Sequence, residues 1–136
     1  MHATTVALIE RYYSAFNSGD MEAFLALVTE DVVHEINEGE REVGRELFAA
    51  FMERMNRSYR EHLTDLVVFA SDDGGRAAAE FVVNGTYLAS DPGLPHAHGQ
   101  TYVLPAGAFF DVRDGKVARI TNYYSLANWI AQVNRG

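Results

Sequence analysis

Residues 6–36, VALIERYYSAFNSGDMEAFLALVTEDVVHEI, carry the pattern most informative about the fold. Apolar residues recur at three- and four-residue steps from Val6 to Phe16, which predicts an amphipathic helix. The segment 17–20 (NSGD) predicts a corner between this helix and a second one. Gly19 suits the left-handed residue that follows a helix end, and Asp20 can accept hydrogen bonds from the first amides of the next helix.

Two further segments extend this outline towards a sheet. The second helix is expected to bury Phe24 and Val28 and to end near Thr29, and the β-branched segment 32–36 then predicts a strand. Near the other end of the chain, residues 107–125 (GAFFDVRDGKVARITNYYS) predict a hairpin of two long strands.

The middle of the chain is expected to change from helix to sheet. A turn at Glu38-Gly39 opens a loop that reaches Gly44, and Pro105, which has no N–H for a sheet ladder, predicts a bulge or bend. In chain order we expect a helix over 45–59, strands over 63–70, 76–88, 100–112 and 117–125, and a short helix over 126–133. Helices first and a curved antiparallel sheet afterwards predict an α+β cone with a small-molecule pocket, formed by a single domain over residues 1–136.

Composition narrows the classes of function. A chain of 136 residues is long enough for one domain with a single core. It contains no cysteine, which excludes disulfides, thiolate catalysis and cysteine-based metal sites. The net charge of −8 opposes phosphate backbones, so no nucleic-acid partner is expected. With no membrane-spanning run and no signal segment in view, a cytoplasmic protein is expected.

Four short motifs resemble a known superfamily. They are Arg11-Tyr12, the corner at 17–20, Glu30-Asp31-Val32-Val33, and the turn Asp114-Gly115-Lys116-Val117. Their order and spacing, over essentially the whole chain, are similar to the NTF2-like superfamily and, within it, to the SnoaL-like proteins related to ketosteroid isomerase. The resemblance implies helices packed in a strongly curved mixed sheet, an apolar cavity and a dimer. The superfamily includes isomerases, dehydratases, cyclases, epoxide hydrolases and binding modules, so the fold does not decide the function.

The resemblance also implies where steroid-isomerase residues would fall. Tyr12 matches a tyrosine on the first helix that donates a hydrogen bond to the oxyanion. The position of the aspartate base holds Ile36, and that of the second oxyanion donor holds Gly107 or Ala108. Because one role of the three is matched, a standard steroid Δ-isomerase is not expected.

His34 is the titratable residue that the sequence places best for proton transfer. It shares a strand face with Val32 and Ile36, and an imidazole can act as base or acid near neutral pH. The alternative is a core or rim histidine with one satisfied hydrogen bond. Glu35 lies on the opposite face, where solvent exposure or a structural ion pair is expected.

The last strand supplies two polar candidates. Ile120, Asn122 and Tyr124 share one face, which by the resemblance looks into the cavity. Asn122 and Tyr124 can then hydrogen-bond a substrate carbonyl or a developing enolate. The alternatives are core packing for Tyr124 and satisfaction of backbone groups for Asn122.

Other residues are candidates for ligand contact. Glu80 is either a pocket acid with a raised pKa or an outer-surface residue. His98 lies with His96 in a loop expected at the mouth, and two histidines do not define a metal site, so no metal is expected. Met52 and Met55 suit an adaptable apolar wall or the core. The candidate ligand-binding residues are Ile36, Met52, Met55, Glu80, Asn84, His98 and Ile120.

Two functions from different classes follow. The first is a cofactor-independent isomerase, cyclase or dehydratase that moves a proton on an apolar carbonyl compound, with His34, Tyr124, Asn122 and Tyr12 as its catalytic residues. No Gly-rich phosphate loop, G-x-S-x-G or H-E-x-x-H motif occurs, so no cofactor is expected. The second is a non-catalytic binding module for an apolar ligand. Under both we expect a homodimer, with aromatic surface supplied by Tyr87, Tyr102, Phe109 and Tyr123.

Overall fold

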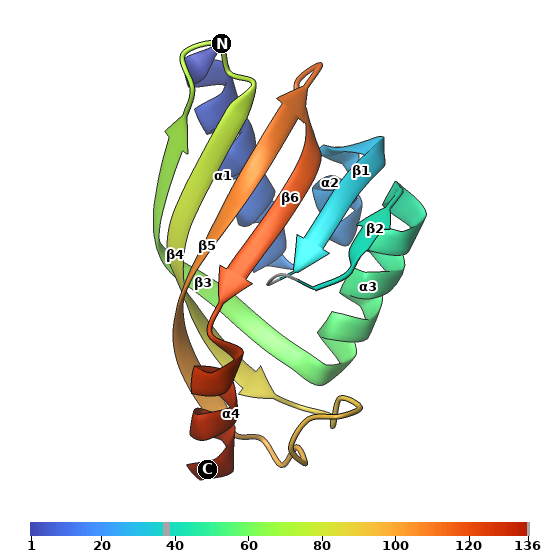
Figure 1. Ribbon diagram of the computed structural model, residues 1–136, viewed down its shortest axis with the longest axis vertical. Helices are drawn as coiled ribbons and strands as arrows, with labels where there is room; N and C mark the ends of the chain where they lie inside the picture. The colour runs from blue at the N-terminus through green and yellow to red at the C-terminus, as the bar shows by residue number, and fades with distance from the viewer. Residues whose placement is uncertain (37–38, 136) are drawn as a thin grey trace.

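A curved six-stranded sheet and the helices on its concave side make up the computed structural model (Figure 1), which describes residues 1–36 and 39–135. The helices are α1 (His2–Ser18), α2 (Met21–Ala26), α3 (Arg45–Ser58) and α4 (Leu126–Arg135). The strands are β1 (Val28–Ile36), β2 (Arg41–Val43), β3 (Tyr59–Ala70), β4 (Arg76–Tyr87), β5 (Thr101–Arg113) and β6 (Lys116–Tyr124). None of the described helices has the length and apolar character needed to cross a membrane.

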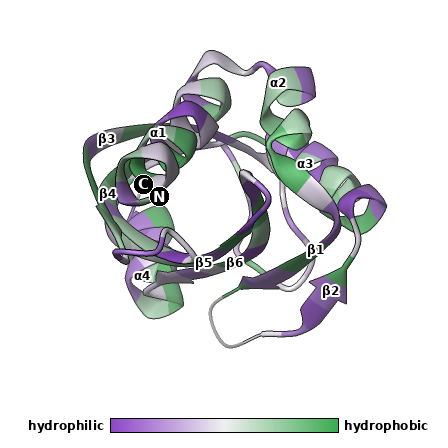
Figure 2. Cartoon of the chain, turned by 90° about the horizontal axis from the view of Figure 1, so that it is seen from above, coloured by the Kyte–Doolittle hydropathy of each residue, from purple (hydrophilic) through white to green (hydrophobic). Residues whose placement is uncertain are grey.

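The strand order is β2-β1-β6-β5-β4-β3, and the pairing of β1 with β6 is parallel while the other described pairs are antiparallel. Viewed from above, the sheet curves strongly, and α1, α2 and α3 lie on its open side (Figure 2). The sequence-based prediction of an α+β cone with a strongly curved mixed sheet is therefore confirmed.

The corner after α1 forms as its residues predict. Gly19 has φ 75° and its N–H bonds to the carbonyls of Ala15 and Phe16, while the Asp20 side chain accepts from the Ala23 amide at 3.1 Å. The predicted end of the second helix near Thr29 is wrong, because α2 ends at Ala26. Val28 instead begins β1, since it pairs with Val117 of β6, and this sheet pairing outweighs the helical spacing.

Two strand boundaries also differ from the prediction. The loop expected up to Gly44 contains β2, whose three residues pair with Val33–Glu35 of β1, and Glu38 of the expected turn lies outside the described residues. β3 begins at Tyr59 rather than at Leu63, because the first residues of this strand pair with the end of β4.

The bulge expected at Pro105 is absent from the described register of β5. Pro105 pairs with Val82 without a shift, and β6 pairs with β5 only from Ala106 onward. β6 does not reach the first residues of β5, and on that side of the strand the Val103 N–H donates to the Gln132 side chain of α4 instead. Pro105 lies two residues further along, so its backbone nitrogen points to the same unpaired side. Its missing N–H therefore removes no hydrogen bond from the sheet. Register shifts occur elsewhere among the described strands: in β3 between Thr64 and Val67, in β5 between Asp111 and Val112, and in β1 between Val28 and Val33.

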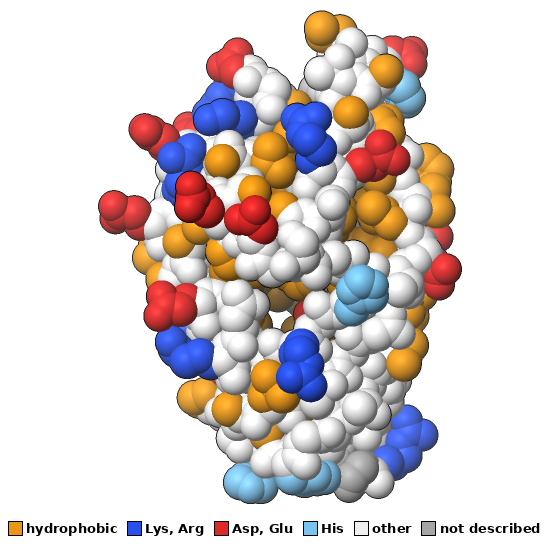
Figure 3. All heavy atoms as spheres, turned by 180° about the vertical axis from the view of Figure 1, so that it is seen from behind, with side chains coloured by type: hydrophobic (Ala, Val, Ile, Leu, Met, Phe, Trp, Pro, Cys, Tyr) orange, Lys and Arg blue, Asp and Glu red, His pale blue; other side chains and the backbone are white. Residues whose placement is uncertain are grey.

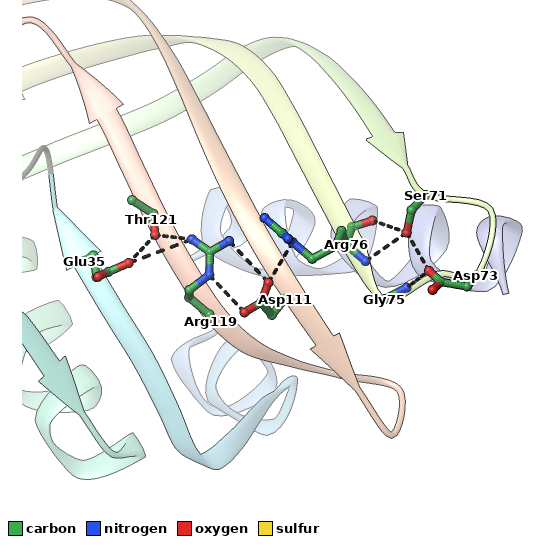
Figure 4. A network of polar contacts seen from close by, with 8 residues as sticks. All are labelled: Glu35, Ser71, Asp73, Gly75, Arg76, Asp111, Arg119 and Thr121. Atoms are coloured by element: carbon green, nitrogen blue, oxygen red, sulfur yellow. Dashed lines mark hydrogen bonds and ion pairs between the residues drawn. The ribbon is translucent and has the colours of Figure 1, made fainter.

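A polar network crosses the convex face of the sheet (Figure 4). Arg119 of β6 bonds to both oxygens of Asp111, at 3.1 and 3.3 Å, and its guanidinium lies 3.9 Å from Glu35. The Thr121 hydroxyl donates to Glu35 at 2.7 Å. Glu35 thus takes the structural role expected for it, joining β1 to β6 on the face away from the core.

Candidate functional site

A cavity of about 580 Å³ lies between the concave face of the sheet and the four helices. A hollow is visible on the face of the molecule shown in Figure 3. The wall of the cavity is mostly apolar and includes Phe16, Phe24, Phe48, Phe51, Met52, Met55, Leu63, Phe81, Leu104 and Ile120. The helices and the sheet therefore enclose a pocket of the size that takes a small organic molecule.

His34 lies in the cavity wall at the β1–β6 side, paired in register with Ile120. Its side chain is 2% exposed, and its ring lies 4.8 Å from that of Phe48 and 4.5 Å from that of Phe51. Removal from water lowers the pKa of His34 to about 4. Glu42 Oε1 lies 3.9 Å from Nδ1, beyond hydrogen-bond distance, so we assign a neutral imidazole near pH 7 rather than an ion pair.

Asn122 and Tyr124 share the cavity-facing side of β6, as predicted. Asn122 pairs in register with Ile36 of β1, which also lines the cavity. Burial raises the pKa of Tyr124, and the carboxylates of Glu61 and Asp91 raise it further. The tyrosine therefore keeps its hydroxyl proton and lies within electrostatic range of both acids.

Two tyrosines of α1 meet the same cavity. Tyr12 is 3% exposed and packs edge-on to Phe110, with ring centres 5.6 Å apart, and burial raises its pKa well above the usual value. The neighbouring Tyr13 also lines the cavity, and its buried hydroxyl has no hydrogen-bond partner among the described residues. Tyr13 belongs to the apolar helix face predicted from the sequence, so its position toward the core is expected. No pattern in the sequence indicates that its hydroxyl would lack a hydrogen-bond partner in the described part of the chain.

Three predicted ligand contacts are misplaced. Glu80 is exposed on the convex side, because its neighbours Ala79 and Phe81 take the concave side. Asn84 donates to the His62 carbonyl at 3.1 Å and to the Thr64 hydroxyl at 3.0 Å, so it ties β4 to β3. His98 is exposed in the loop after β4 and is not part of the cavity wall. The other expected contacts, Ile36, Met52, Met55 and Ile120, do line it.

A second polar region of the cavity is not predicted by the sequence reading. Tyr59 donates to Asp91 at 2.8 Å, and Tyr102 donates to Glu61 at 2.5 Å. Tyr59, Glu61 and Asp91 line the cavity, and burial raises the pKa values of Tyr59 and Glu61. The signal was available in the alternation of Tyr59, Glu61 and Leu63, but a strand start placed at Leu63 concealed it.

Aromatic side chains from α4 and the sheet support this second region. Trp129 is 3% exposed, and its ring centre lies 4.9 Å from that of Tyr87 and 5.9 Å from those of Tyr59 and Tyr102. The C-terminal helix therefore closes one end of the cavity with its tryptophan.

A second hollow, of about 630 Å³, lies on the surface away from these groups. Its lining is charged and polar: Thr29, Glu30, Asp31, Arg45, Arg113, Asp114 and Lys116. Arg113 and Asp31 already neutralise one another there at 2.5 Å. We take the apolar cavity as the site, because it alone of the two collects His34, Glu61 and Asp91.

Comparison with known proteins places this architecture. Its curved sheet, covering helices and cavity define an NTF2-like cone, and a solved NTF2-like protein of Burkholderia xenovorans LB400 shows the same fold at 18% identity, with a TM-score of 0.78 and 98% of each chain covered. Residues 9–120 match the model of the SnoaL-like domain. The chain belongs to the SnoaL-like family. No match is found among curated proteins.

Two solved structures are much more similar. One, from Pseudomonas putida KT2440, is 64% identical, with a TM-score of 0.94, 95% of this chain and 97% of that chain covered. The other, from Xanthomonas campestris pv. campestris, is 58% identical, with a TM-score of 0.94, 97% of this chain and 98% of that chain covered. Each is described as a "putative polyketide cyclase". This chain is similar to both over almost its full length.

Proposed function

We propose that the protein is a cofactor-independent enzyme of cyclase or isomerase type that moves a proton on an apolar carbonyl compound. The observation that carries the proposal is the meeting of His34, Asn122, Tyr124 and Tyr12 on the wall of one apolar cavity. Cyclisation of a polyketide also requires proton movement next to carbonyl groups, so the description of the two similar structures agrees with this chemistry.

The chemistry follows from the protonation states of these groups. A neutral imidazole offers one acceptor nitrogen and one N–H, so His34 can exchange a proton with the substrate. Asn122 and the protonated Tyr124 hydroxyl can donate to a carbonyl oxygen as negative charge develops on it. The largely apolar wall lowers the local dielectric constant, which strengthens both interactions.

The test uses a simple carbon acid, 2-tetralone, in D₂O. Proton NMR follows the exchange of the hydrogens next to its carbonyl for deuterium. His34→Ala and Tyr124→Phe are each expected to lower the protein-catalysed exchange rate by about a hundredfold, the lower range for loss of a positioned proton-transfer or oxyanion group. Glu80→Gln, on the convex face, is the control and is expected to retain the wild-type rate. Unchanged exchange in both site variants, with circular dichroism showing folded protein, contradicts the assigned roles.

The second candidate is a non-catalytic binding module. It is favoured by Ile36 and by the Gly107-Ala108 pair, which stand where the steroid isomerases carry two catalytic acids. A bound apolar ligand then raises the melting temperature, because it binds the native state alone, and is recovered unchanged. Recovery of a converted product excludes this candidate.

We also propose that the protein is a homodimer whose subunits meet through the convex face of the sheet. Apolar side chains 42% to 59% exposed support this: Val67, Phe69, Val103, Phe109 and Tyr123. The expectation that Tyr87 and Tyr102 add to this surface is wrong, because both are buried on the concave side. Light scattering after size exclusion is expected to give roughly twice the chain mass of 15.1 kDa, and Phe109→Glu to give the single-chain mass. A wild-type monomer at micromolar concentration contradicts the proposal.

A further inference from the structure

Glu61, Gly85 and Tyr102 form one row across three strands of the concave face. Glu61 of β3 pairs with Gly85 of β4, and Gly85 pairs with Tyr102 of β5. The outer two side chains meet above the glycine, where the Tyr102 hydroxyl donates to Glu61 Oε2 at 2.5 Å. A Cβ atom added at Gly85 would overlap the Tyr102 ring. The missing side chain of Gly85 therefore makes the room in which this hydrogen bond forms.

Tyr102 is itself held from the other side. It is 2% exposed, and its ring packs edge-on to that of Trp129 with ring centres 5.9 Å apart. One carboxylate oxygen of Glu61 is thus fixed by a donor on β5 whose ring packs against α4. The other oxygen, Oε1, accepts no hydrogen bond from the described part of the chain, and Glu61 lines the cavity. This geometry presents one oxygen of a positioned carboxylate to a bound molecule.

The surroundings of Glu61 contain acids and phenols rather than cations. The titratable groups that face it are Tyr102 from β5, Tyr124 from the end of β6, and the Tyr59–Asp91 pair. Arg60 is the one Lys or Arg among the described residues of the cavity wall, and its side chain is exposed. Burial raises the pKa of Glu61, and the Tyr102 hydrogen bond opposes that rise. A carboxylate without a cation partner is a stronger base than one held in an ion pair.

We infer that Glu61 is the catalytic base that takes the proton from the carbon next to the substrate carbonyl, with Tyr102 as its positioning residue. The inference rests on the proposed function and assigns its carbon-directed step. The C–H bond breaks as an O–H bond forms at Glu61 Oε1, and the C–H electron pair moves onto the carbonyl oxygen as an enolate. Tyr124, which lies within electrostatic range of Glu61, can donate to that oxygen. The Glu61 acid then returns the proton to a different carbon of the conjugated enolate, so the product is an isomer of the substrate and the carboxylate is restored.

This assignment gives the two regions of the cavity different tasks. Isomerisation and cyclisation each remove a proton at one atom and deliver a proton at another. His34 lies on β1, the strand next to the edge strand β2, and Glu61 lies on β3, the strand at the opposite edge. The two side chains line the cavity from different strands, so each can reach a different atom of one substrate. Glu61 transfers the proton at the carbon atom, and His34 exchanges a proton with the carbonyl oxygen.

The experiment is the deuterium exchange of 2-tetralone measured for Glu61→Gln, with Glu80→Gln on the convex face of the next strand as the matched control. Glutamine keeps the shape of the side chain and can still accept from Tyr102, but it is no base. We expect Glu61→Gln to lower exchange at least a hundredfold and Glu80→Gln to leave it unchanged. Loss of exchange in His34→Ala with full exchange in Glu61→Gln overturns the inference and leaves the proposed function intact. No exchange above buffer with wild-type protein overturns both.

A second measurement tests the positioning role of Tyr102. Its hydrogen bond lowers the pKa of Glu61, so Tyr102→Phe is expected to move the acid limb of the pH–rate profile to higher pH. Gly85→Ala, which forces the Tyr102 ring aside, is expected to move the limb in the same direction. If Tyr102 has only a structural role, its replacement lowers the exchange rate equally at every pH and does not move the acid limb of the pH–rate profile. That result in both variants, each shown to be folded by circular dichroism, overturns the role of Tyr102.

Discussion

Replacing Trp129 by alanine is expected to lower the free energy of unfolding by about 3 to 5 kcal/mol, the range for removing a large buried aromatic side chain. Trp129 is 3% exposed and contacts the rings of Tyr59, Tyr87 and Tyr102, so its loss leaves a void that three strands cannot fill by small movements. Because it is the one tryptophan of the chain, unfolding in urea has to be followed by far-ultraviolet circular dichroism.

Leu126 provides the control on the same helix. It is 39% exposed, so Leu126→Ala is expected to change the free energy of unfolding by less than about 1 kcal/mol. A large difference between the two variants shows that α4 is a fixed wall of the cavity. Equal and small effects contradict this, because a helix that docks weakly frays locally without loss of global stability.

The sequence predicts those elements whose pattern is local. The α1 stripe, the cap at Gly19 and the side-chain bond from Asp20 depend on neighbouring residues, and they lie where expected. The boundary at Val28 fails because it is set by a partner, Val117, that is distant in the chain. β2 is not predicted, for the same reason. Three residues are too few to show an alternating pattern, and they form a strand only because they pair with β1.

The second limit on prediction from the sequence is which face of a strand points toward the core. Alternation along β4 separates Glu80 from Phe81 but does not say which of them meets the helices. The structure decides it through packing, as Phe81 lies against Tyr13 of α1 with ring centres 5.0 Å apart. The same choice turns Tyr87 and Tyr102 inward, contrary to the prediction.

The same distinction between local and long-range determinants explains which residues of the candidate site could be predicted. His34, Asn122 and Tyr124 could be placed because they lie in strands whose alternation was read from the correct residue. The pairing of Glu61 with Tyr102 could not be, because it depends on the register of three strands and on the room above Gly85. Neither property is local in sequence.

The pH dependence of stability is expected to report the burial of His34 directly. Its pKa is about 4 in the folded protein against 6.5 in an exposed histidine, so between these values the unfolded chain binds the proton and the native chain does not. Stability is therefore lost as the pH falls through this window. Between about pH 7 and about pH 4.5 the wild type is expected to lose on the order of 2 to 3 kcal/mol more than His34→Leu, which has no proton to bind. Urea unfolding of both proteins at the two pH values measures this difference, and His98→Leu, at an exposed histidine, is expected to follow the wild type. If Glu42, 3.9 Å away, instead forms an ion pair with a protonated His34, the trend reverses and the wild type gains stability over His34→Leu towards acid pH.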